Sequence, residues 1–296
     1  MSRWRPDADR ARLDDRLLVV AARVSAAASA GIVLLIGGFL LVESLPALRA
    51  LGVAPFAGMS WHPTGGTDGG QFGLMPMLVG TLAAGGGAVA LATPLALLAA
   101  VVCVFLAPPR IALLLGRVIE LLAGIPSVVY GFWGLVVLVP LIRRLEPPGP
   151  SLLAGILVLA LMILPTLALA ADAALRAVPR ELLTAASALG LSRTTTLVGV
   201  ALPAARSGLW TGLLLGVGRA LGETMAVLMV CGNVVQVPGT VFDPVRTLTA
   251  NIALEMAYAL DLHRAALFVS GLVLALLVTV LVLAAQATTA GSEAHP

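Results

Sequence analysis

Two charged residues stand four positions apart inside an apolar stretch, and their chemistry suits a charged ligand. Residues 213–227 read LLLGVGRALGETMAV, in which Arg219 and Glu223 carry the only charges. A charged side chain near the centre of a bilayer costs about 2.5–3.5 kcal/mol on insertion scales. A guanidinium presents two parallel N–H groups that fit a tetrahedral oxyanion. The pair therefore predicts an anion pathway in which Glu223 holds Arg219 between passages, with Thr224 beside it. The alternative is a self-neutralising ion pair that only fixes the rotation of the helix.

The composition indicates that this stretch lies in a membrane. The chain has 296 residues, of which 59% are hydrophobic and 11% are charged, whereas soluble domains are about one quarter charged. Apolar windows of about 20 residues predict an all-α polytopic membrane protein with six transmembrane helices. The predicted spans are residues 17–43, 74–106, 118–142, 151–171, 206–232 and 264–286. The basic residues are scattered and form no stripe, which argues against nucleic-acid binding.

Small residues recur along the fifth span at Gly208, Gly212, Gly216 and Ala220. Such a ridge lets a second helix approach closely, because lipid supplies no hydrophobic force between helices. Arg219 and Glu223, placed on one continuous helix, then flank the packed face of that helix.

A second chemical feature lies in the third span, where residues 124–127 read GIPS. This tetrapeptide is expected to break the helix, and freed backbone groups at membrane depth are tolerated when they line a cavity. Ser127 and Tyr130 are the predicted polar lining of that cavity.

The sequence contains none of the short motifs for metal hydrolysis, acyl transfer or nucleotide binding. Cys103 and Cys231 lie far apart in apolar runs, and no histidines cluster at ligand spacing. We therefore expect no cofactor or metal in this chain and no enzymatic activity. If ATP drives the protein, another chain must bind it.

The connection between the fourth and fifth spans, residues 172–208, is unusually apolar for a loop. It is expected to form a short helix after Pro179, a break at Gly190, a second short helix and a stop at Pro203. Arginines are concentrated on the side of this loop and of the N-terminal tail, which predicts that both termini lie in the cytoplasm. Outside, a short interfacial helix is expected at residues 251–260.

This loop resembles that of binding-protein-dependent ABC importer permeases. Their pattern is Glu-Ala-Ala, three residues, Gly, nine residues, Ile, one residue and Leu-Pro. This sequence matches its spacing at Thr184, Ala185, Ala186, Gly190, Val200, Leu202 and Pro203. Thr184 replaces the glutamate of the pattern, and Glu181 lies nearly one turn away. The resemblance implies a type I ABC importer permease fold in which this loop docks into an ATPase subunit.

Residues 218–233 (GRALGETMAVLMVCGN) and 120–135 (ELLAGIPSVVYGFWGL) resemble the phosphate-specific PstC-type branch of this family. The resemblance implies half of the pathway of an ATP-driven inorganic phosphate importer in the cytoplasmic membrane. Its implied partners are a PstA-type permease, two copies of an ATP-binding subunit that hold ATP and magnesium, and an extracytoplasmic phosphate-binding protein.

The expected organisation follows from the spans and this resemblance. It has a cytoplasmic tail at residues 1–16, a first helix with an outside loop at 17–73, a permease domain at 74–286 and a cytoplasmic tail at 287–296. The coupling loop covers residues 172–206 of the permease domain.

Three other functions compete with this interpretation. A permease for sulfate or molybdate is the nearest, because a membrane arginine does not by itself distinguish tetrahedral anions. A secondary transporter driven by an ion gradient would need no ATPase and often shows an internal repeat, which is not evident here. A membrane-embedded enzyme is disfavoured, because no polar residues cluster at ligand spacing.

Overall fold

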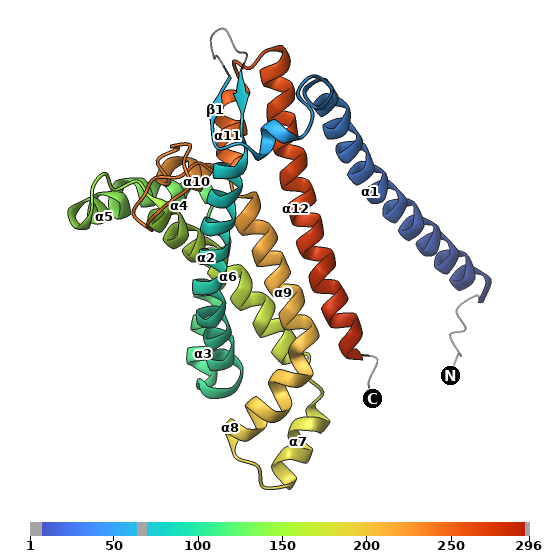
Figure 1. Cartoon of the computed structure of the whole chain (residues 1–296). Helices are drawn as coiled ribbons and strands as arrows, with labels where there is room; N and C mark the ends of the chain where they lie inside the picture. Colours follow the sequence, from blue (N-terminus) through green and yellow to red (C-terminus); the bar gives the residue numbers. More distant parts are fainter. Residues whose placement is uncertain (1–7, 64–69, 294–296) are drawn as a thin grey trace.

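The protein is an all-α bundle with one small β-hairpin. The computed structural model describes residues 8–63 and 70–293 (Figure 1). Six segments of this part are long and apolar enough to cross a membrane, which agrees with the six predicted spans. They are Leu17–Leu51, Met75–Leu106, Ser127–Leu145, Leu152–Arg176, Arg193–Gly222 and Asp261–Ala284.

The helices of the described chain divide into long spans and short connecting pieces. The spans contain α1 (Ala8–Leu51), α2 (Met75–Val101) with η2 (Val102–Leu106), α4 (Ser127–Trp133) with η3 (Gly134–Leu138) and α5 (Val139–Leu145), α6 (Leu152–Arg176), α8 (Arg193–Thr196) with η4 (Leu197–Ala201) and α9 (Leu202–Gly222), and α12 (Asp261–Glu293). The short pieces are η1 (Ala54–Ala57), α3 (Pro109–Ala123), α7 (Arg180–Ala188), α10 (Met225–Val230) and α11 (Leu248–Glu255).

Helix α6 lies at the centre of the bundle and packs against α2 and α9. The predicted ridge of small residues on α9 forms this contact. A methyl group added at Gly212 or Gly216 would lie only 2.6 Å from Ala170 or 2.5 Å from Leu167 of α6. The ridge is therefore confirmed as a close helix–helix seam.

Helix α1 diverges from this bundle. It packs against α12 near its C-terminal end, where Ser44 and Ala47 are buried. Its preceding stretch runs away from the bundle (Figure 1), and the side chains of residues 17–39 are exposed. The apolar side chains of that stretch suit a lipid environment, in which exposure of leucine and valine has no hydrophobic cost.

The end of the bundle opposite α7 and α8, which we call the hairpin end, is closed by β1 (Trp61–His62), β2 (Gln71–Phe72) and α11 (Figure 1). The strands pair antiparallel, and Trp61 packs edge-on against Phe72. Helix α11 begins and ends earlier than the helix predicted at residues 251–260. Its first turn is buried in the protein, against the rest of the hairpin end.

Two predicted spans are not continuous helices. The third breaks at residues 124–126, as the GIPS sequence predicts, so α3 precedes the membrane segment that starts at Ser127. The fifth, predicted as one helix over residues 206–232, ends at Gly222 and is followed by the separate helix α10. Periodicity did not reveal this second break, because the groups that stabilise it come from another helix, as described below.

Candidate translocation pathway and coupling loop

The predicted turn of Arg219 and Glu223 has a different geometry from the one expected. Helix α9 ends at Gly222, and Glu223 has extended dihedral angles of φ −68° and ψ 133°. The two side chains therefore do not stack on one helical face. Among the described residues, no ion pair joins Arg219 to Glu223. The predicted helical pairing is wrong for this conformation.

Arg219 is half-buried and points toward α6. Its Nη1 atom donates a hydrogen bond of 3.0 Å to Oγ1 of Thr166. Sequence reasoning missed Thr166, for which the only signal was a threonine directly after a proline in an otherwise apolar span.

Glu223 and Thr224 lie at the break between α9 and α10. The Oε1 atom of Glu223 accepts a hydrogen bond of 3.2 Å from the backbone N–H of Ala226, so this carboxylate caps α10. The Glu223 carbonyl accepts from the hydroxyl of Thr249 at 2.8 Å. Thr224 is half-buried, and its Oγ1 lies 3.4 Å from the Gly222 carbonyl.

These contacts explain why the helix can break here. A carbonyl released from a helix at membrane depth needs a partner within the protein. Thr249, in the first turn of α11, supplies one to Glu223. Helix α11 is itself fixed to α2, because Thr81 accepts the backbone N–H of Leu248 at 2.9 Å. No pattern in the sequence pointed to Thr249.

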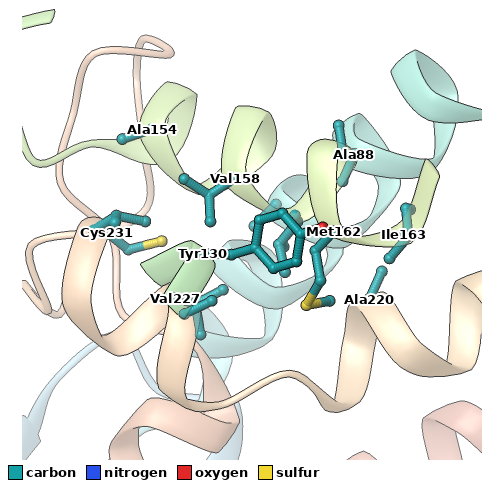
Figure 2. Close-up of a cluster of buried hydrophobic side chains, with 14 of the residues drawn as sticks. Ala88, Tyr130, Ala154, Val158, Met162, Ile163, Ala220, Val227 and Cys231 are labelled. Atoms are coloured by element: carbon teal, nitrogen blue, oxygen red, sulfur yellow. The ribbon is translucent and has the colours of Figure 1, made fainter. Parts of the chain in front are cut away.

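Ser127 and Tyr130 begin the second half of the broken third span, but they have different surroundings. Ser127, at the start of α4, is half-buried. The Tyr130 hydroxyl donates to the Leu122 carbonyl of α3 at 2.8 Å, across the break at residues 124–126. Figure 2 shows the Tyr130 ring within the apolar core, near Val158 and Met162. Tyr130 thus secures the break rather than standing open in a cavity.

The broken helices α4 and α10 cross at close range. A methyl group at Gly131 would lie 2.8 Å from the Cα atom of Ala226. Glycine is thus required where the two backbones approach each other, within one turn of both Tyr130 and Glu223.

The loop between α6 and α9 has most of the predicted form. Helix α7 covers Glu181, Thr184, Ala185 and Ala186, and it projects beyond the bundle (Figure 1). Gly190 adopts the left-handed φ of +72°. Ser192 then caps α8 by accepting the N–H of Thr195 at 3.1 Å. A short helix, a break at Gly190 and a second helix are confirmed.

The expected stop at Pro203 is wrong, because the helical segment continues from Arg193 to Gly222. A wide turn directly precedes the proline, in which the N–H of Leu202 bonds the carbonyl of Leu197, five residues back. The same arrangement precedes Pro140, where the N–H of Val139 bonds the Gly134 carbonyl. A wide turn changes the hydrogen-bond register before the proline, so the chain remains helical through it.

The tip of this loop presents both polar and apolar side chains. Glu181, Thr184 and Ala185 are exposed, whereas Ala186 is buried. Leu189 is also exposed at 79% of its surface. The Thr184 hydroxyl donates to the Arg180 carbonyl of its own helix at 2.9 Å, which leaves Glu181 as the exposed anion of this turn. Within the described residues, no group of three histidine, cysteine or acidic side chains is arranged to hold a metal ion.

Comparison with known proteins agrees with the spans and the loop. Residues 92–289 match the family described as "Binding-protein-dependent transport system inner membrane component". The chain belongs to this family. It is therefore a multi-pass membrane permease of the ABC transporter class, a class whose members work with ATPase and substrate-binding partners.

Several relatives cover most of the chain. The "Probable ABC transporter permease protein YqgH" of Bacillus subtilis is 39% identical over 249 residues, which are 82% of this chain and 79% of that protein. The "Phosphate transport system permease protein PstC" of Mesorhizobium japonicum is 33% identical over 87% of this chain and 85% of its own length. PstC 1 of Mycobacterium tuberculosis is 35% identical over 74% of this chain and 75% of its own.

The fold matches a solved importer. An inward-facing form of the MetNI methionine ABC transporter aligns with a TM-score of 0.59 at 19% sequence identity, over 74% of this chain and 97% of that chain. The predicted type I ABC importer permease fold is thereby confirmed. At this identity the likeness concerns the fold alone.

Proposed function

We propose that this chain is the transmembrane permease subunit of an ATP-driven inorganic phosphate importer and forms half of its translocation pathway. The observation that carries the proposal is the charged break at the end of α9. There the Arg219 guanidinium, inside an apolar span, bonds the neutral hydroxyl of Thr166. The carboxylate of Glu223, four residues along the chain, bonds the backbone N–H of Ala226 instead of the guanidinium. Names of relatives that refer to phosphate transport support the choice of anion.

The geometry changes how the two charges would act. Conduction requires binding strong enough to attract the anion and weak enough to release it. Glu223 is separated from Arg219 in this conformation, which leaves the guanidinium able to receive an anion. A rotation at the 222–224 break would bring the carboxylate toward Arg219 and help to displace the anion. Thr224 and Ser127 complete the proposed path.

The remaining partners follow from the proposed function. A PstA-type permease would cover the other half of the pathway, and an extracytoplasmic phosphate-binding protein would deliver phosphate at the hairpin end. Two copies of an ATP-binding subunit would hold ATP and magnesium, so this chain itself would be a transport subunit and no enzyme. Both termini and α7 would then lie in the cytoplasm, in agreement with the arginine distribution.

Coupling would occur through the 172–206 loop. Closure of the ATPases would push on α7, with Glu181 supplying the charged contact that Thr184 lacks. The continuous helical segment from Arg193 to Gly222 would carry that movement directly to the charged break.

The test is uptake of labelled phosphate by the complete complex in vesicles, with wild type compared with Arg219→Gln. Loss of charge-assisted hydrogen bonds of about 1.5–3 kcal/mol should reduce uptake at low phosphate by roughly 10–100-fold. Arg264→Gln is the matched control, because Arg264 lies far from the charged break in an exposed pair with Glu43 at 3.8 Å and over the ring of Phe268 in its own helix. Its uptake should equal that of wild type.

Excess sulfate or molybdate in the same assay separates phosphate from the other oxyanions. An uptake rate that neither competitor changes supports phosphate as the substrate. An uptake rate abolished by one competitor would assign that anion as the substrate. Wild-type uptake in the Arg219→Gln complex would contradict the assignment of the charged break to the pathway.

A further inference from the structure

Thr166 has an unusual role among the threonines of the membrane helices. Thr93, Thr211 and Thr279 each donate their hydroxyl hydrogen to the carbonyl four residues earlier in the same helix, at 2.7–3.0 Å. The Thr166 oxygen instead accepts from Arg219. Its hydroxyl hydrogen has no acceptor among the described residues, so one hydrogen-bond donor remains beside the guanidinium.

Arg219 is held by this contact alone within the part of the chain described. Intramembrane ionisable residues normally pair with one another or with backbone carbonyls. Here no carboxylate lies within 4.0 Å of the guanidinium among the described side chains. A hydroxyl that accepts a hydrogen bond from a cation becomes a stronger donor through its own hydrogen, since linked hydrogen bonds polarise one another.

We infer that Thr166 is a further anion-binding residue of the pathway, which orients the Arg219 guanidinium and donates its hydroxyl hydrogen to the same oxyanion. This inference rests on the proposed function. A tetrahedral anion at this point would receive an N–H from Arg219 and the O–H from Thr166. The carboxylate of Glu223 would not oppose it, because that group caps α10 through Ala226.

The experiment measures phosphate uptake against phosphate concentration for wild type, Thr166→Val, Thr166→Ser and the control Thr93→Val. Valine removes the donor and the support for Arg219 but keeps the branched shape. The apparent KM should rise roughly tenfold while the maximal rate per assembled complex stays near that of wild type. Serine retains the hydroxyl and should restore the wild-type KM. Thr93→Val removes a hydroxyl that bonds only its own helix and should leave the KM unchanged.

The outcomes separate the two proposals. No phosphate uptake by the assembled wild-type complex would contradict the proposed function. Uptake by wild type together with an unchanged KM in Thr166→Val would overturn the inference while leaving that function intact. A purely structural role would lower the amount of assembled complex in Thr166→Val without changing the KM of the remainder, and this result would also overturn it.

Discussion

The carboxylate of Glu255 accepts three hydrogen bonds at the hairpin end of the molecule. Its replacement by glutamine tests how much these bonds contribute to the stability of the protein. The side chain is 7% exposed and ends α11. Its Oε1 accepts from Nη1 of Arg246 at 2.6 Å. Its Oε2 accepts a hydrogen bond of 2.7 Å from Nε1 of Trp61 and lies within hydrogen-bond distance, 2.9 Å, of Nε2 of His263. One carboxylate therefore joins Trp61, 194 positions away in the sequence, to Arg246 and His263 on either side of α11.

Glutamine has the same shape but only one acceptor oxygen. If that oxygen accepts the hydrogen bonds from Trp61 and His263, the amide NH₂ group faces the Arg246 guanidinium, so two hydrogen-bond donors face each other. Loss of a hydrogen bond to a charged group costs about 1.5–3 kcal/mol, and a buried unsatisfied donor costs about 1–3 kcal/mol more. Arg246 still donates hydrogen bonds to Oδ1 of Asn251 at 3.0 Å and to the Asn233 carbonyl at 2.9 Å. The total cost should therefore lie near the lower end of the sum of these two ranges. We expect Glu255→Gln to destabilise the protein by about 3 kcal/mol.

The assay is thermal unfolding of the purified complex in detergent at one scan rate. By the scaling for larger domains, about 3 kcal/mol corresponds to a fall in Tm of roughly 6–12 °C. Glu43→Gln is the matched control at the same end of the bundle. Its pair with Arg264 is 3.8 Å long and 35–55% exposed, so it should cost less than about 1 kcal/mol. Equal shifts for the two variants would refute the reasoning, because burial would then add nothing to the contact.

Two further predictions concern the crossing of α4 with α10 and the loop that joins α10 to α11. Gly131→Ala places a methyl group 2.8 Å from the Ala226 backbone and should cost about 1–3 kcal/mol in thermal unfolding. Gly116→Ala, where a methyl group meets nothing within 4 Å, should be neutral or stabilising, and equal destabilisation of both would contradict the close crossing of α4 and α10. In the loop between α10 and α11, the N–H groups of Thr240 and Gly239 bond the Asp243 carboxylate and hold its pKa below the ordinary value of 3.8. The stabilisation is therefore present above pH 3.8 and is lost as the pH falls through the lower folded pKa, so hydrogen-exchange protection of these two amides should fall there. Asp243→Asn should lack this pH dependence, and a persistent dependence would assign it to another group.

Local sequence features predicted the parts of the fold that depend on neighbours in the chain. Apolar length indicated the six spans, since each must cross a hydrocarbon layer of fixed thickness. The glycine ridge of α9 indicated its packed face, and the structure places α6 against it. Gly190 and Ser192 predicted the turn between α7 and α8 because both act on the adjacent backbone.

The tertiary structure decided what the sequence pattern could not. Arg219 and Glu223 have the spacing of a helical ion pair, yet the Arg219 side chain bonds Thr166, 53 residues away, and the Glu223 backbone carbonyl bonds Thr249, 26 residues away. The Thr166 contact orients the guanidinium, and the Thr249 contact satisfies the backbone carbonyl of Glu223 at a break that helical periodicity did not predict. Trp61 and Glu255, 194 positions apart, likewise meet only after folding. The sequence alone thus determined which residues enter the membrane and which charges enter with them. Whether those charges pair or stand apart depended on hydrogen-bond partners that packing brings from other helices, such as Thr166 for Arg219 and Thr249 for the Glu223 carbonyl.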